Sequence, residues 1–411
     1  MINTNKRLFI FFLIIFANSI LFSAPFFSGM TGVKLNYHGN TEIIENESTY
    51  NPYLSLQAFF AGQFNFSEKV WGRTEFSIET QNLLNTNIFN EGTETNFRIE
   101  ELSLVIKGNL SNSINYFNIF MGSYEQIGSD TFLQKYFGIE PIASKLTTSW
   151  LGLNGSDLYK QRGFGFGDII KSKNTPVAFG LYGYINSDTI NNNNSRIFVF
   201  NTDVRFATTL QYFTLYLLCG IGFPLPQNDP NYIIAIEKLY WHAGANILIG
   251  NNYTQSLFFQ LGIFNAEFKK DKVNILTESL YLLFEPRLNF GNWNIDVTFY
   301  NISRKNRPDL PLLDGSLGGN LNVYLESVRI AGKPFTFGLN TNVSLDTIDL
   351  LQIFSETPPL ENDFVENFNV AISAYGSTQF LSGELNFIIK LNILKLQENP
   401  FSIDIGFKTK I

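Results

Sequence analysis

The chain has a single cysteine and only two histidines among its 411 residues. The lone cysteine, Cys219, excludes a disulfide within the chain and leaves the N-terminal segment without the cysteine of a lipoprotein. His38 and His242 belong to no cluster with the spacing of metal ligands, and no supported nucleophile–base pair is visible around them. The sequence therefore predicts that the protein is not an enzyme and uses no metal or other cofactor.

Long apolar runs are also missing, with one exception at the N-terminus. Lys6 and Arg7 precede the apolar run Leu8–Ala17, which is too short to span a membrane as a helix and has the layout of a secretory signal peptide. We expect residues 1–24 to be a cleaved signal, with the cut somewhere within 19–24. Residues 25–411 are then predicted to form one domain.

Charged residues are scarce, at 16% of the chain, and acidic residues outnumber basic ones. Of the 29 basic residues, two lie in the predicted signal, so the mature chain carries 27 against 36 acidic residues, a net charge of −9. This balance argues against nucleic acid as a partner. A low share of charge is instead typical of a chain in which one face of each strand meets lipid.

Aromatic residues are abundant, with 42 Phe and 18 Tyr. Many lie in stretches of about ten residues in which apolar and polar side chains alternate, the length and pattern of a tilted transmembrane strand. The apolar positions of five such stretches are Leu54, Leu56, Ala58, Phe60, Phe64, Phe66; Trp293, Ile295, Val297, Phe299; Phe335, Phe337, Leu339, Val343; Leu385, Phe387, Ile389, Leu391, Ile393; and Phe401, Ile403, Ile405, Phe407. The sequence thus predicts an all-β fold, a transmembrane antiparallel up-and-down barrel.

The predicted connections alternate between short turns and long polar links, as in outer-membrane barrels. Short turns are expected at 67–68, 109–113, 207–210, 251–252, 291–292, 331–333 and 376–379. With a strand at Arg162–Ile170 the barrel has about 18 strands and both chain ends face the periplasm; about 16 strands is the alternative. A soluble sandwich or an extended repeat protein is a rival interpretation, but no repeat period is visible.

The stretch Met121–Asp130 (MGSYEQIGSD), followed by Phe132–Ile139 (FLQKYFGI), resembles the porin-like outer-membrane proteins of spirochaetes. The signal segment and the many Asn, Ile and Phe residues agree with this resemblance. It implies a barrel that lets solutes pass, without indicating which solute. One departure is the last residue, Ile411, because many outer-membrane barrels end on an aromatic residue that the assembly machinery reads.

Charged residues predicted to point into the lumen are the candidates for a functional site. They are Arg73, Glu75, Glu79, Asp203, Arg205, Glu285, Arg287 and Asp296. Such residues either form a ring that tunes ion preference or merely satisfy one another inside a solvated barrel. Both signs occur at similar frequency, so no strong selectivity is predicted. His38 and His242 are expected to face the lumen or its rim.

The longest connection, residues 124–160, differs from the other links because it is rich in large apolar side chains. Leaving such groups in water costs roughly 1.5–3 kcal/mol each. We expect this segment to fold into or across the barrel mouth and to narrow it; capping the rim from outside, or containing another strand pair, are the alternatives. The charged residues it would offer to a solute are Glu125, Asp130, Lys135, Glu140 and Lys145.

The function predicted from these features is passive diffusion of small hydrophilic solutes across the cell outer membrane. The expected partners are outer-membrane lipid, the barrel assembly machinery and the solutes themselves. A transporter of hydrophobic substrates is one alternative, although the first strand, Met30–His38, starts too close to the signal to leave room for an N-terminal plug. A surface adhesin acting through its long loops is the other.

Overall fold

The computed structural model describes residues 26–39, 41–44, 47–84, 95–125, 128–148, 158, 162–189, 196–225, 238–251, 254–269, 272–274, 279–303, 310–354, 359, 361–396 and 400–411. The predicted signal peptide lies outside the described residues. So does most of the second half of the long connection, residues 149–157 and 159–161.

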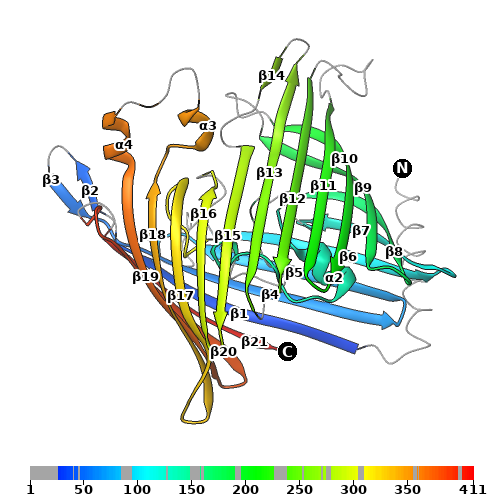
Figure 1. The fold of residues 1–411 in the computed structure, drawn as a ribbon, viewed down its shortest axis with the longest axis horizontal. Coiled ribbons are helices and arrows are strands. Elements are labelled where there is room, and N and C mark those ends of the chain that lie inside the picture. Colours follow the sequence, from blue (N-terminus) through cyan, green and yellow to red (C-terminus); the bar gives the residue numbers. More distant parts are fainter. Residues whose placement is uncertain are drawn as a thin grey trace.

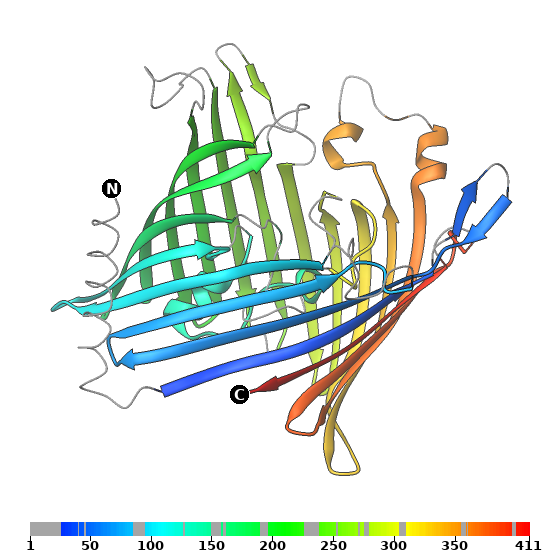
Figure 2. The same cartoon turned by 180° about the vertical axis from the view of Figure 1, so that it is seen from behind.

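Eighteen antiparallel strands form one closed barrel, which confirms the predicted fold class (Figure 1). β1 pairs with β4 on one side and with β21 on the other, and this closes the sheet (Figure 2). The wall strands are β1 (Phe26–His38), β4 (Tyr53–Ser67), β5 (Val70–Thr80), β6 (Thr95–Asn109), β7 (Ser113–Gly122), β8 (Gly163–Ser172), β9 (Val177–Thr189), β10 (Arg196–Leu210), β11 (Phe213–Leu225), β12 (Lys238–Gly250), β13 (Ser256–Lys269), β15 (Leu280–Phe290), β16 (Trp293–Asn301), β17 (Leu317–Ile330), β18 (Lys333–Leu345), β19 (Phe368–Phe380), β20 (Gly383–Asn392) and β21 (Phe401–Lys410). The strand expected at Arg162–Ile170 is β8, and it brings the number to the predicted 18.

Burial is inverted relative to a soluble protein, because apolar side chains face out and polar ones face in. On β18, Leu339 is 52% exposed whereas its neighbour Asn340 is fully buried. On β16, Phe299 is 56% exposed and Thr298 is fully buried. The period-two pattern thus assigned the two faces of these strands correctly. A wall that is apolar outside and fully paired along its backbone is the β solution to spanning lipid.

Short turns gather at one end of the barrel, together with the two ends of the described chain. The turn predicted at 207–210 lies at Gln211 and Tyr212 instead, and the one predicted at 376–379 lies at Leu381 and Ser382. Leu381 and Ser382 both have positive φ, 48° and 66°. Such turns usually contain Gly or Asn, and the sequence therefore predicts the turn at nearby Gly376. In the structure Gly376 lies within β19.

Long connections lie at the opposite end and carry the smaller elements. β2 (Thr41–Ile44) pairs with β3 (Glu47–Tyr50), and β14 (Lys272–Asn274) pairs antiparallel with the end of β13. The helices α3 (Leu350–Ile353) and α4 (Glu361–Asn367) lie between β18 and β19. The connection from β7 to β8 holds the helix α2 (Thr131–Phe137) and the 3-10 helix η1 (Lys145–Thr147). Within the described part of the chain, no helix is both long and apolar enough to cross a membrane.

Inward-facing glycines of the wall lie beneath tyrosine rings of the next strand. A Cβ atom at Gly165 would clash with Tyr184, and one at Gly167 would clash with the ring of Tyr182. The Tyr281 hydroxyl likewise occupies the space that a side chain at Gly262 would need. The glycines of the Gly163–Gly167 stretch therefore allow large rings to pack flat against the wall.

Candidate functional site

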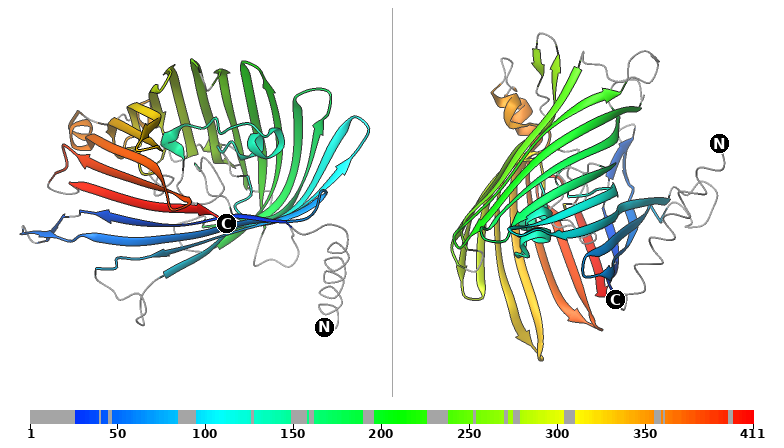
Figure 3. Two further views of the ribbon diagram at one scale, coloured as in Figure 1. Left: turned by 90° about the horizontal axis from the view of Figure 1, so that it is seen from below. Right: turned by 90° about the vertical axis from the view of Figure 1, so that its right-hand side faces the viewer.

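The described part of the connection between β7 and β8 lies inside the barrel rather than over its rim. Seen from below, the ring of strands surrounds α2 (Figure 3). Phe132 and Leu133 of α2 are fully buried, and the Phe132 ring lies 5.5 Å from the ring of Tyr216 on β11. Ile142, Leu146 and further apolar residues join the same cluster. Burying such side chains is worth roughly 1.5–3 kcal/mol each, which explains why an apolar connection leaves the aqueous rim.

Polar side chains of the wall bind the backbone of this segment, which we call the inner segment (residues 123–125 and 128–148). Arg205 on β10 donates to the carbonyl oxygen of Glu125 at 2.6 Å, and Asn246 on β12 donates to that of Ser129 at 3.1 Å. Gln260 on β13 donates to the carbonyl oxygen of Gly128. These bonds satisfy backbone groups that would otherwise be buried without partners.

Asp130 holds the inner segment together. One carboxylate oxygen accepts from the backbone N–H groups of Ile142, at 2.7 Å, and Ala143, at 3.0 Å, and the other accepts from the Gln134 amide at 2.8 Å. The side chain is fully buried. Asp130 was expected to face a solute, but in this position it acts as an internal brace that joins α2 to the chain before η1.

Glu125 is the centre of a buried charge cluster. Its carboxylate accepts hydrogen bonds from Tyr136, at 2.9 Å, and from Tyr182, and Arg205 lies 3.6 Å from it. The Lys135 ammonium is 3.7 Å away. Burial lowers the pKa of Lys135, and the nearby carboxylates of Glu101 and Glu125 oppose this effect. Glu125, Lys135 and Arg205, predicted from separate parts of the sequence, are thus brought together.

The same cluster continues along the wall to Asp203 and His242. Arg205 lies 3.5 Å from Asp203, and His242 Nε2 lies 2.8 Å from the same carboxylate. Tyr184 also donates to Asp203. His242 is fully buried on the inner face, whereas Cys219 on β11 is exposed on the outer face, in phase with Leu217.

A second charge cluster binds the other end of the inner segment. Glu285 on β15 accepts from Ser144 at 2.5 Å, from Thr298 at 2.6 Å and from Arg287 at 2.7 Å. Arg287 also donates to the carbonyl oxygen of Ile142 at 2.8 Å. The predicted residue Asp296 lies opposite Arg287 in the β15–β16 register. This cluster therefore stabilises the segment from the facing wall.

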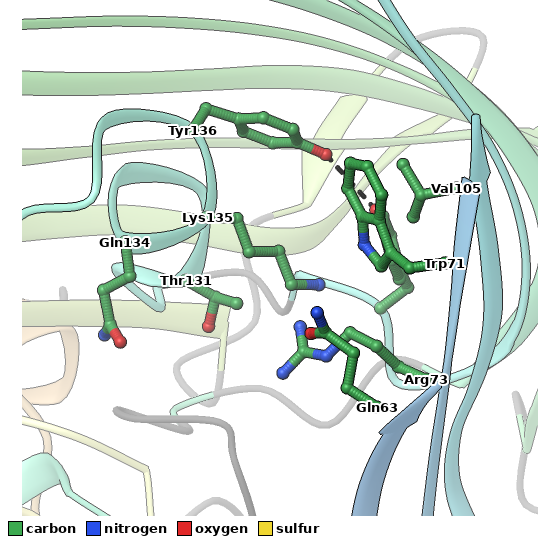
Figure 4. A pocket seen from close by; sticks show the side chains of 9 residues that line it. Gln63, Trp71, Arg73, Val105, Thr131, Gln134, Lys135 and Tyr136 are labelled. Atoms are coloured by element: carbon green, nitrogen blue, oxygen red, sulfur yellow. Dashed lines mark hydrogen bonds between the residues drawn. The ribbon is translucent and has the colours of Figure 1, made fainter. Parts of the chain in front are cut away.

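The remaining predicted residues lie nearer the edges of these clusters. Glu79 pairs with Arg98 at 3.1 Å, and Lys145 pairs with Glu326 at 2.7 Å. Glu75 is buried on β5, and Glu140 is exposed on the inner segment. Arg73 lies 3.9 Å from Glu101 and faces Lys135 across a cavity (Figure 4).

A second stretch also folds inward, and sequence reasoning missed it. Leu310, Leu312 and Leu313, between β16 and β17, are buried in the same cluster as α2. Lys390 on β20 donates to the carbonyl oxygen of Leu313 at 3.1 Å, and Asn369 on β19 donates to Asp314 at 2.6 Å. The signal was present, because three leucines stand together in an otherwise polar link.

Two of the cavities formed by the described residues lie beside these inward-folded stretches. One, of about 300 Å³, is lined by residues of β4, β5, β6 and the inner segment, among them Trp71, Arg73 and Lys135. The other, of about 260 Å³, lies against β18–β21 and β1 and includes Lys34, Lys145 and Asp404. Lys34 and Asp404 form an ion pair at 3.1 Å. In the described part of the chain, no group of three or more His, Cys, Asp or Glu side chains is placed to hold a metal ion.

No protein-family model matches this sequence, and no curated protein matches it. Among solved structures it is similar to OccK7 (OpdD) of Pseudomonas aeruginosa, with 9% identity and a TM-score of 0.48 over 95% of this chain and 99% of the other. Acinetobacter baumannii OccAB3 is 10% identical with a TM-score of 0.48, over 93% and 99% of the two chains. Salmonella typhi OmpF is 10% identical with a TM-score of 0.39, over 93% and 97%.

At such low identities these likenesses concern the fold, so the function has to be inferred from the residues of this chain. None of the three proteins is from a spirochaete, and the resemblance to that group stays a prediction.

Proposed function

We propose that this protein is an outer-membrane channel for the passive diffusion of small hydrophilic solutes, and that the inner segment narrows its lumen. The proposal rests on the difference in polarity between the outer and inner faces of the closed barrel wall. The outer face is apolar, as lipid requires, and the inner face is lined by amides, hydroxyls and ion pairs.

The wall is suited to a hydrophilic solute because its inward positions carry amide and hydroxyl groups rather than apolar side chains. Asn340, Asn342 and Ser344 follow one another along β18, and Asn320 and Asn322 face them on β17. A transporter of hydrophobic substrates would need a continuous apolar path instead. The two cavities beside the inner segment give a hydrophilic solute room to enter.

The inner segment is suited to narrow the channel because both of its ends are fixed to the wall. Arg205 and Gln260 bind it before α2, and Arg287 binds it after α2. A segment fixed at several points keeps one shape, and a constriction needs such rigidity to sieve solutes by size.

The proposal is tested by replacing residues 129–148 with a short Gly/Ser linker and recording single-channel currents in planar bilayers. The expected result is a measurable conductance for the wild type and a larger one for the variant. The matched control shortens residues 350–366, around α3 and α4, which lie beyond the barrel rim (Figure 1). This control should leave the conductance unchanged.

Folding of each variant is checked first, by the shift in gel mobility between unheated and boiled samples. A folded wild type without conductance would contradict the channel proposal. Equal conductance of the folded wild type and the folded inner-segment variant would contradict the constriction.

A further inference from the structure

The cavity of about 300 Å³ next to α2 is lined by two cationic side chains, Arg73 from β5 and Lys135 from α2. Their charged ends point toward each other across the cavity, with the Gln63 amide beside them (Figure 4). Trp71 and Tyr136 form an aromatic wall on one side. Among the described residues no acidic side chain lines this cavity, although Glu101 and Glu125 lie within 4 Å of the two cations.

Those acids accept hydrogen bonds from neutral hydroxyl groups, and one of their oxygens, Glu101 Oε2, has no hydrogen-bond partner within the described chain. Glu101 is 1% exposed and accepts from Ser103 at 2.6 Å. Glu125 is fully buried and accepts from the hydroxyl groups of Tyr136 and Tyr182, and the Arg205 guanidinium lies 3.6 Å from its carboxylate. Neutral hydroxyl donors therefore supply much of what a cation would otherwise give to these carboxylates.

The cations, by contrast, keep unused donors. Arg73 lies 3.9 Å from Glu101, and Lys135 lies 3.7 Å from both Glu101 and Glu125. These separations give Coulomb attraction but exceed the length of a charge-assisted hydrogen bond. Within the described chain, Arg73 Nε and Lys135 Nζ have no hydrogen-bond partner at all. Both cations therefore have donors left for a ligand, and they are the charged side chains that line this cavity among the described residues.

We propose that this cavity binds a small oxyanion, a carboxylate or a phosphate, between Arg73 and Lys135, and that the channel favours anions at this point. An oxyanion would give Arg73 and Lys135 the acceptors that the buried acids do not provide, and the planar guanidinium suits the two oxygens of either group. The anion preference rests on the proposed channel function. The binding site does not, and it can be tested separately.

Binding is measured first, on folded protein in detergent, by following tryptophan emission during titration with sodium acetate and, separately, with sodium phosphate. Trp71 lines the cavity, and a Trp71→Phe variant identifies its share of the signal. Saturation by acetate alone assigns a carboxylate site, and saturation by phosphate alone assigns a phosphate site. Arg73→Gln should weaken binding about tenfold, because it removes a charged donor.

Two further variants keep this test decisive. Lys135→Gln removes the second cation, which lies on a different element, so this variant can be titrated in place of Arg73→Gln if Arg73→Gln does not fold. Arg98→Gln is the matched control, since it deletes the same charge on β6 where Arg98 pairs with Glu79, away from the cavity. Absence of saturation by both anions, or equal weakening by Arg98→Gln, would overturn the site.

Ion preference is measured next, from the reversal potential across a bilayer that separates two KCl concentrations. The ratio of chloride to potassium permeability should fall several-fold in Arg73→Gln and Lys135→Gln and stay near the wild-type value in Arg98→Gln. A conducting channel whose ratio is the same in all three variants would refute the preference while leaving the channel function intact. A wild type that binds acetate or phosphate but does not conduct would support the site and refute the channel.

Discussion

Placing an arginine on the lipid-facing side of β20 directly tests which face of this strand contacts lipid. Ile389 is 42% exposed on the outer face and pairs with Ala374 on one side and Ile403 on the other. It lies seven residues beyond Ser382 in the turn between β19 and β20, or roughly 23 Å along the strand at about 3.3 Å per residue. With a tilt of about 45°, this is about 16 Å above the turn, near the middle of an apolar band about 25 Å tall.

At that depth the substitution Ile389→Arg should destabilise the folded barrel by about 2–4 kcal/mol, the cost of an arginine at the bilayer midplane. This corresponds to a decrease of about 30- to 900-fold in the folding equilibrium constant. The physical reason is that the guanidinium loses its hydration and finds no acceptor on the outer face.

The measurement is an equilibrium denaturant titration of the protein folded into lipid vesicles, compared with Asn386→Arg. Asn386 is on the inner face of the same strand and lines the cavity of about 260 Å³, so its arginine stays in contact with water. Asp404 is unsuited as a control, because replacing it breaks its ion pair with Lys34. Equal losses of stability at Ile389 and Asn386 would refute the assignment of the two faces.

Two further predictions use the same vesicle preparation. Gly262→Ala should destabilise the barrel by about 1–3 kcal/mol, because the new Cβ collides with the Tyr281 ring. The control Gly319→Ala should destabilise it much less, because the nearest atom to its new Cβ is 3.8 Å away. Similar losses of stability in the two variants would show that the Tyr281 ring can move aside. Cys219, exposed on the outer face, should react slowly with a water-soluble maleimide in vesicles and rapidly in denaturant; fast labelling in vesicles would place it in water.

The faces of the strands could be predicted from the sequence because side-chain direction in a strand alternates with a period of two. Lipid demands apolar groups on every outward position, so the alternation at Trp293–Tyr300 and Phe335–Ser344 identified both faces without any knowledge of strand order. The same reasoning found β8 and led to the even strand number. It also identified the inner segment as a connection too apolar for water, since the cost of leaving apolar side chains in water can be estimated from the residue types.

The partners of that segment were decided by the tertiary structure. Arg205 and Glu125 are 80 residues apart in the chain, and Gln260 and Gly128 are 132 apart. Asn246 and Gln260 look in the sequence like ordinary inward polar residues of a strand, and only the curvature and register of the barrel bring them to the backbone of the segment. The same holds for Asp130, which the sequence offered as a solute contact and the fold uses as a brace. Hydrogen bonds require atoms within a few ångströms, and no local pattern of residues specifies which distant strands will meet at that distance.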